Sequence, residues 1–455
     1  MESSDDTEEP PLPLALSRFQ VSEEFGFLLP DPLTELPAPY SPWMDLAQEL
    51  PQLISSHQLR SRVHQMPQLS TQHLRGREEL HLAHLVLSFI TMGYVWQEGE
   101  EGTVQVKARA PPTGAKPSAV AAAGGPPCLQ MGAFPQPGSI PAFPVLCATQ
   151  VLPRNLAVPY WEVSQALGLP PILSHADFVL ANWRRKDPNG NLDTIITLPG
   201  GESLRGFTLV TLLVEKAAVP GIKAIVQALG AVLQRDEESL HRALQELAGA
   251  IGAMSEALRR MHAHHTLVWL PITSGLNPFL LDYVDPQVFY SVIRIFLSGW
   301  KDNPAMPHGL IYEGVSPEPL AFSGGSAAQS SVLHAFDELL GICHRQDTAF
   351  VRALRGAGSV RRCVLASGDA RLRAAFNRCV CALTDFRSQH IAIVTKYIAI
   401  AATKARARRA EPGASAGPSA GKPPAALETK GTGGSHIFSF LKSIRDSTRE
   451  GLISA

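Results

Sequence analysis

Apolar residues recur at every third or fourth position along most of this chain, and this spacing constrains the fold more than any other feature. The clearest example follows Asp236, a candidate helix N-cap, with Glu237 and Glu238 in the first turn of the predicted helix. One helical stripe then contains Leu240, Leu244, Leu247, Ile251, Met254, Leu258 and Met261. The alternation typical of strands is scarce, and residues 193–198 are the only fair candidate. The sequence therefore predicts an all-α protein.

The same spacing predicts helices over residues 77–96, 206–218, 222–233, 288–297, 332–342, 372–404 and 438–452. Two stretches between them lack periodicity. Residues 103–148 are rich in Ala, Gly and Pro, which predicts a disordered insert. Residues 405–434 begin basic and continue as Ala, Gly, Ser and Pro, so we expect a mobile loop between two helices. The acidic, polar residues 1–18 are also expected to be disordered.

Charge and composition exclude several classes of protein. The net charge of the 455 residues is −1, so no global field attracts nucleic acid or anionic lipid. The N-terminus lacks the basic and apolar regions of a secretory signal. No apolar run reaches the ~18–20 residues of a membrane span, and residues 391–402 are interrupted by Lys396. Six cysteines give no disulfide framework, so we expect a reducing, cytoplasmic setting without nucleic-acid or membrane partners.

Several short motifs suggest chemistry but lack the necessary spacing. His262, His264 and His265 do not share one helix face, and no cysteine or acid lies nearby at zinc-site spacing. The sequence Gly324-Gly-Ser326 is one glycine short of a nucleophile elbow and follows no predicted strand. There is no Cys-x-x-Cys-His, which excludes covalent attachment of a c-type haem.

His390 lies on the apolar stripe of the predicted 372–404 helix. For a lone histidine, a core position satisfied by a hydrogen bond is the commoner explanation. A neutral imidazole in an apolar helical pocket is also what a haem iron requires as its proximal ligand. Arg387, one turn earlier, would face either a haem propionate or an acidic partner. The residues alone leave these alternatives open.

A set of longer motifs resembles one known family, the indoleamine 2,3-dioxygenases. The motif Arg387-Ser-Gln-His390-Ile-Ala-Ile-Val-Thr-Lys-Tyr397 is similar to the family's proximal helix. Further matches are Leu152-Pro-Arg-Asn-Leu-Ala, Pro170-Pro-Ile-Leu, Val179-Leu-Ala-Asn-Trp183, Arg294-Ile-Phe-Leu-Ser-Gly-Trp300, Gly324-Gly-Ser-Ala-Ala-Gln-Ser330 and Lys430-Gly-Thr-Gly-Gly434. They are collinear from about Phe19 to Ile453, and details such as Tyr94-Val-Trp-Gln-Glu-Gly-Glu100 are most similar to the second of the family's two paralogues.

The resemblance implies a small helical domain over residues 19–183 and a large helical haem-binding domain over residues 184–455, in which 405–434 includes a lid loop. It also implies one haem b for each chain. The expected reaction inserts both atoms of O₂ across the indole C2–C3 bond of L-tryptophan and gives N-formylkynurenine, the first step of the kynurenine pathway. The cofactor carries this chemistry, while the protein orients the substrate and excludes water. An electron donor that keeps the iron ferrous, and a monomeric chain, are further expectations.

On the haem side, the resemblance makes His390 the iron ligand and Asp337 the acidic partner of Arg387. On the substrate side, Phe289 matches an aromatic residue that packs on the indole, and Arg294 matches the arginine that binds the substrate carboxylate. Without the family, Arg294 would be interpreted as part of a solvated face. The remaining expected pocket residues are Thr211 above the iron, Val179, Tyr290, His175, Phe178, Ser326 and Ala327, with Thr432, Gly433 and Gly434 in the lid.

The chain departs from the family pattern in three places. Residues 103–148 and a second stretch near 264–281 are inserts at loop positions. Between Ile342 and Phe350 the family has a further segment, Met-Arg-x-Tyr-Met-Pro-Pro, which this chain lacks. His175 and Phe178 stand where the first paralogue has Tyr and Cys. These departures keep a second hypothesis open, a haem-binding regulatory protein with little or no turnover.

Overall fold

The computed structural model describes residues 16–97, 150–187, 191–262, 284–344, 359–410, 431–432 and 436–454. Within them the chain is helical, as the sequence predicts. The first group of helices is α1 (Ser41–Gln48), α2 (Leu50–Ser55), α3 (Leu59–Gln65), α4 (Gly76–Trp96) and α5 (Arg154–Leu167). The second is α6 (Gly201–Ala217), α7 (Val219–Gln234), α8 (Glu237–Arg259), α9 (Pro286–Val288), α10 (Ser331–Leu340), α12 (Ser359–Ser367), α13 (Ala370–Val394), α14 (Ala401–Ala410) and α15 (Ile437–Arg449).

Shorter turns connect the α-helices. The described ranges include three π-helical turns, η4 (Ala176–Ala181), η6 (Phe289–Ile293) and η9 (Thr395–Ile400). The 3₁₀ turns are η1 (Leu16–Phe19), η2 (Ala38–Tyr40), η3 (Thr71–His73), η5 (Arg260–His262), η7 (Arg294–Leu297) and η8 (Ala327–Gln329). The predicted N-cap of α8 is confirmed, because the Asp236 side chain accepts a hydrogen bond from the Ser239 backbone N–H.

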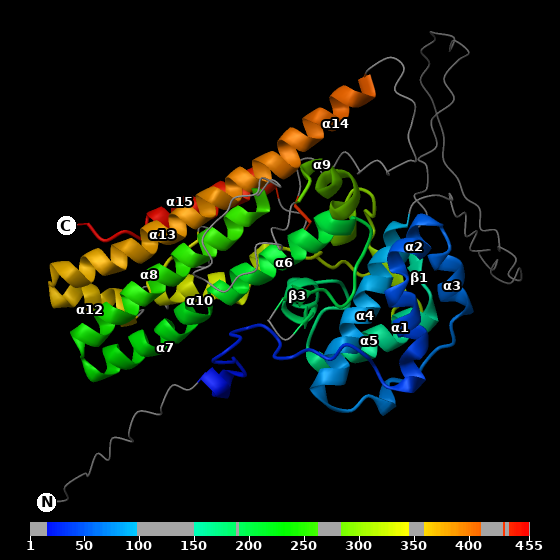
Figure 1. The fold of residues 1–455 in the computed structure, drawn as a ribbon, viewed down its shortest axis with the longest axis horizontal. Helices are drawn as coiled ribbons and strands as arrows, with labels where there is room; N and C mark the ends of the chain where they lie inside the picture. The colour runs from blue at the N-terminus through cyan, green and yellow to red at the C-terminus, as the bar shows by residue number, and fades with distance from the viewer. Residues whose placement is uncertain are drawn as a thin grey trace, which may run out of the picture. The chain divides into compact units, whose positions relative to one another are not determined.

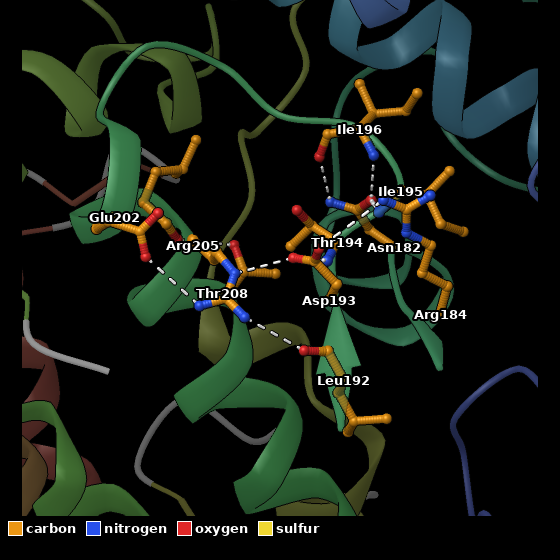
Figure 2. A network of polar contacts seen from close by, with 11 residues as sticks. Asn182, Arg184, Leu192, Asp193, Thr194, Ile195, Ile196, Glu202, Arg205 and Thr208 are labelled. Atoms are coloured by element: carbon orange, nitrogen blue, oxygen red, sulfur yellow. Dashed lines mark hydrogen bonds and ion pairs between the residues drawn. The ribbon is translucent and has the colours of Figure 1, made fainter. Parts of the chain in front are cut away.

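Strands are confined to two small pairs among the described residues. β1 (Gln150–Leu152) pairs in parallel with β4 (Leu310–Tyr312), a contact that the sequence did not predict. β2 (Arg184–Arg185) and β3 (Leu192–Asp193) pair antiparallel. The predicted strand 193–198 is therefore wrong beyond Asp193. The side-chain amide of Asn182 bonds the backbone of Ile195 and Ile196 instead, which leaves these groups unavailable to a partner strand (Figure 2).

The extents of other predicted segments also differ from the structure. The expected 288–297 helix is divided into α9, η6 and η7. The long C-terminal helix runs from α13 through η9 and α14 to Ala410, so the expected mobile loop is wrong for residues 405–410 (Figure 1). Residues 16–18 belong to η1 rather than to a disordered terminus. The 103–148 insert and residues 411–430 of the expected lid lie outside the described residues.

The buried apolar side chains form two main clusters. The first is built largely from α1, α2, α4, α5 and η4, and extends across the expected domain boundary to Leu204 and Tyr312. The second lies between α7, α8, α10, α12 and α13, where α13 packs along α8 and α15 (Figure 1). Phe207 on α6 and Phe289 on η6 pack against both clusters. A binding site is therefore expected at the boundary between the two clusters. None of the described helices combines the length and apolarity needed to cross a membrane.

Candidate haem and substrate site

His390 lies near the end of α13 and is half-buried. Burial lowers the pKa of its imidazole to about 4, and the positive charge of Arg387 acts in the same direction. No side chain or backbone group in the described ranges forms a hydrogen bond with this ring. That absence disfavours the explanation of a core histidine satisfied by a hydrogen bond. A neutral ring nitrogen without a protein partner is what a haem iron binds, so the residues present here fit a haem.

Behind His390, Arg387 is held by two buried groups. Its Nη2 donates to Asp337 Oδ2 at 2.7 Å, and its Nη1 donates to the hydroxyl of Thr448 on α15. His344 Nε2 lies 2.8 Å from the same Asp337 oxygen. Burial alone raises the pKa of Asp337, but the hydrogen bond from His344 and the charge and hydrogen bond of Arg387 outweigh it, so the pKa is lowered. The structure thus brings Asp337 and Arg387 together as expected, and adds His344 and Thr448.

A row of aromatic rings leads away from this helix. Tyr397, two turns beyond His390, meets Phe289 edge-on with ring centroids 5.8 Å apart. Phe289 meets Phe207 at 4.9 Å, Phe207 meets Phe178 at 5.8 Å, and Phe178 stacks on Phe89 at 6.1 Å. Such rings offer the apolar faces on which a planar aromatic ligand stacks. Phe289 and Phe178 were expected here, whereas Phe207 was not.

Each of the three π-helical turns carries residues of this region. Phe178 and Val179 lie in η4, Phe289 and Tyr290 in η6, and Tyr397 in η9. A π-turn inserts one residue into a helix and changes the direction of the side chains that follow, and such turns are frequent at functional sites. Val179 and Tyr290 are buried, and Tyr290 packs against Ala401 and Ala402 at the start of α14.

Arg294, the first residue of η7, is 1% exposed. Its interpretation as part of a solvated face is therefore wrong, and the position implied by the family resemblance is compatible with this burial. A buried guanidinium is costly unless it is paired and hydrogen-bonded. The burial of Arg294 therefore favours a role in which its positive charge binds a group inside the protein.

Helix α6 brings polar groups to the same region. The hydroxyl of Thr211 donates to the Phe207 carbonyl at 2.8 Å. One turn later, Glu215 is buried and its Oε1 lies 2.8 Å from Nε2 of His175. The start of α6 is fixed by Arg205, whose guanidinium donates to Asp193 at 2.9 Å and to the Leu192 carbonyl at 3.4 Å (Figure 2). This network joins α6 to the β2–β3 pair.

Thr432, which the resemblance places in the lid, contacts the glycines that precede Ser326. The Thr432 carbonyl accepts from the backbone N–H groups of Gly299, at 3.1 Å, and Gly324, at 3.3 Å, and its hydroxyl donates to the Gly325 carbonyl at 2.6 Å. A Cβ atom on Gly299 would overlap the backbone at Gly324, and a Cβ atom on Gly324 would overlap the backbone at Gly299. Glycine is therefore required at both positions. Ser326 caps η8 in a capping box with Gln329, whereas Ala327 is exposed. Gly433 and Gly434 lie outside the described residues.

Other candidates do not assemble into a site. No cluster of three or more His, Cys, Asp or Glu side chains able to hold a metal ion occurs in the part of the chain that the structure describes. His262 stacks on Tyr397 at 5.6 Å, and its Nδ1 lies 3.2 Å from the Lys396 amine. His264 and His265 fall outside the described ranges.

Five residues of the region were missed at the level of sequence. Phe207 and Glu215 lie one turn before and one turn after Thr211, a helical spacing that would have found them. Thr448 reaches the site from a distant point of the chain, and His344 lies in the loop that follows α10. Ser330 ends the quoted motif that begins at Gly324, but the motif does not indicate its contact with Glu215.

The fold and this arrangement define a class: an all-α protein with a row of aromatic rings between two apolar clusters, and a neutral helix histidine that has no hydrogen-bond partner among the described residues. Comparison with known proteins identifies the family. The sequence model of the indoleamine 2,3-dioxygenase family matches residues 15–451. The chain is 49% identical to human indoleamine 2,3-dioxygenase 2, over 97% of this chain and 96% of that protein. It is 38% identical to mouse indoleamine 2,3-dioxygenase 1, over 96% of each chain.

A third relative has a different kind of name. A protein of Haliotis madaka named myoglobin is 34% identical, over 96% of this chain and 98% of that protein. The chain therefore belongs to the indoleamine 2,3-dioxygenase family, an enzyme family of haem dioxygenases.

Proposed function

We propose that the chain is a haem-dependent dioxygenase that opens the indole ring of L-tryptophan and related indoleamines with O₂ and releases N-formylkynurenine. Membership of the family supports this proposal. The observation that carries it is the state of His390, a half-buried imidazole with a pKa of about 4 and no hydrogen-bond partner among the described residues. The helix of His390 continues to Tyr397, whose ring contacts that of Phe289. When bound, haem b supplies the activation of O₂.

The residues of the chain have the following roles in this proposal. His390 holds the iron, and the Asp337–Arg387 ion pair fixes the orientation of its helix. Phe289 and Phe207 bind the faces of the indole, while Phe178, Val179, Tyr290 and Thr211 line the remaining pocket together with His175. Arg294 binds the substrate carboxylate in a charge-assisted pair. Ser326, Ala327 and Thr432, with Gly433, cover the amino-acid end and exclude water. An electron donor keeps the iron ferrous, and the chain acts as a monomer with one haem.

A second function deserves a test because of the relative named myoglobin, a name given to oxygen-binding haem proteins. In this alternative the chain binds haem and acts as a regulatory or signalling protein with little or no turnover. Both hypotheses require haem at His390, and only the first yields N-formylkynurenine.

The experiment is an assay of the haem-loaded full chain with L-tryptophan, O₂, ascorbate and methylene blue. We expect N-formylkynurenine, detected by its absorbance and by mass. His390→Ala should abolish stable haem binding, with loss of the Soret band, and leave the helical circular dichroism largely intact. The exposed His308→Ala is the matched control. An unchanged Soret band in His390→Ala would exclude His390 as the ligand, and a haem-loaded chain without product would favour the alternative.

A further inference from the structure

Glu215 is a buried carboxylate in the middle of the candidate substrate region. Its side chain is 5% exposed, and it lies on α6 one turn after Thr211. Taking a carboxylate out of water is unfavourable unless hydrogen bonds replace its hydration. Two side chains do so, and both contact the same oxygen. His175 Nε2 lies 2.8 Å from Oε1, and the Ser330 hydroxyl donates to Oε1 at 2.7 Å. Because a carboxylate only accepts, this geometry requires the proton on Nε2 of His175.

The two partners belong to different segments of the chain. His175 comes immediately before η4, the π-turn that carries Phe178 and Val179. Ser330 ends the turn that begins at Ser326, and it is the N-cap residue of α10, the helix that carries Asp337. Glu215 therefore joins α6, the π-turn η4 and the Ser326 turn at a single atom. These segments are separated by 40 and 115 residues in sequence from Glu215.

Between the described residues of these three segments, few other polar contacts occur. The backbone N–H of His175 donates to Gln329 Oε1 at 3.0 Å, but the Gln329 side chain is exposed to water. A hydrogen bond in a water-poor interior is stronger than one that water can replace. Loss of the Glu215 contacts would also leave the buried His175 imidazole without its partner. The Glu215 contacts thus tie η4 to α6 and to the Ser326 turn, whereas the bonds of Asp177 with His84 and Ser174 hold η4 against other parts of the chain.

We propose that Glu215 is a positioning residue of the substrate site, which sets the distance between the Thr211 helix, the aromatic π-turn and the Ser326 turn through His175 and Ser330. The proposal rests on the proposed function, since it assigns these segments to the pocket for the indole. Glu215 acts through its two partners and is not itself assigned a contact with the substrate.

The test compares Glu215→Met, which removes the acceptor, with Glu215→Gln, which keeps an acceptor oxygen of the same shape. Glu202→Met on the exposed first turn of the same helix is the matched control. We expect Glu215→Met to raise the KM for L-tryptophan about ten-fold, the effect of leaving a buried group unsatisfied, with a smaller change in kcat. Glu215→Gln should restore the KM to within about three-fold, because its oxygen can still accept from Ser330.

The second readout does not require turnover. Carbon monoxide bound to the ferrous protein reports the polarity and packing of the pocket through its infrared stretching band. We expect this band to shift or broaden in Glu215→Met and to be unchanged in Glu202→Met. If the wild type binds carbon monoxide but makes no product, the proposed function fails while this readout still decides the role of Glu215. Equal KM values and equal bands in Glu215→Met and wild type would overturn the proposal.

If Glu215→Met does not fold, the same measurements are made on Ser330→Ala and His175→Phe, because each variant removes one of the two hydrogen bonds to Glu215. Each should produce a smaller KM increase of the same kind and a shifted carbon monoxide band. A change in melting temperature alone, with the KM and the band of the folded protein unchanged, would show that Glu215 serves only stability.

Discussion

Arg294 is almost fully buried, so its guanidinium has lost most of its hydration. A substrate carboxylate would form a charge-assisted pair with this guanidinium. We expect Arg294→Ala to raise the KM for L-tryptophan strongly, because removing one partner of a buried charge pair costs about 2–5 kcal/mol. The Soret band of the haem-loaded protein should be unaffected.

Tryptamine lacks the carboxylate of tryptophan. Comparing the two substrates therefore distinguishes loss of carboxylate binding from general damage to the site. If Arg294 binds the carboxylate, Arg294→Ala should alter the kinetics of tryptamine far less than those of tryptophan. An equal loss with both substrates would show that Arg294 serves the fold rather than the substrate.

His84 and Asp177 form a further buried pair, with Nδ1 of His84 2.5 Å from Oδ1 of Asp177. Burial by itself raises the pKa of Asp177, but the charge and hydrogen bond of His84 and two bonds from Ser174 lower it overall. A carboxyl with a lowered pKa contributes stability above its unfolded pKa of about 3.9, and this stability is lost as the pH falls through the lower folded value. Asp177→Asn should therefore reduce the melting temperature at pH 7.

The size of this effect should depend on pH in a defined direction. Removing one partner of a buried pair costs about 3–5 kcal/mol, so the difference from wild type should be large at neutral pH. The difference should narrow below about pH 4, where the carboxyl of the unfolded chain begins to be protonated while the folded carboxyl, with its lower pKa, is still ionised. A difference that is constant from pH 7 to pH 3 would contradict this account of the pair.

At the scale of elements, Thr432 is joined to the backbones of Gly299, Gly324 and Gly325 by three hydrogen bonds, one to each. Thr432→Val keeps the shape and removes the hydroxyl bond to Gly325, with a cost of about 1 kcal/mol. We expect a KM for tryptophan about five-fold higher, because Thr432 would be held less firmly against Gly325. Thr432→Ser retains the hydroxyl and should behave as wild type. Identical KM values for the Val and Ser variants would show that the hydroxyl does not contribute.

Helix positions and caps were largely predictable because they are local. The Asp236 cap and the stripe from Leu240 follow from neighbours within a few residues, and both are present in α8. The π-turns were not predictable, since one additional residue in a helix leaves the apolar spacing almost unchanged. This is why the 288–297 helix divides at Phe289, which the periodicity does not indicate.

The candidate site was partly predictable for a similar reason. His390 and Arg387 are one turn apart on one helix, so their association is visible in the sequence. The contacts of Asp337 with His344 and of Glu215 with Ser330 join segments distant in the chain or depend on a loop conformation. Burial of Arg294 likewise depends on tertiary packing, which one-dimensional spacing does not specify.

At the scale of the whole molecule, we expect a weak dioxygenase, chiefly because the family segment after Cys343 is missing rather than because of the inserts. A longer surface loop adds only about 0.6 kcal/mol for each doubling of its length. The missing segment would lie between the helices of Asp337 and His390, where a shift of about 1 Å can cost on the order of 100-fold in rate.

Three versions of the chain test this prediction: the natural one, one without residues 103–148, and one with the family segment inserted after Cys343. Insertion should raise turnover or retention of haem, and deletion of residues 103–148 should change little. Equal turnover of tryptophan in the natural and the restored chains would refute it.

Phe207 and Phe289 belong to both apolar clusters, which has a consequence for the lifetime of the protein in a cell. A molecule bound between the clusters interacts with the native state alone, and it stabilises that state by RT ln(1 + [L]/Kd). The population of locally opened chains, which proteases recognise, then falls as the concentration of that molecule rises. The amount of this protein would thereby follow the supply of its own ligands, without any change in its synthesis.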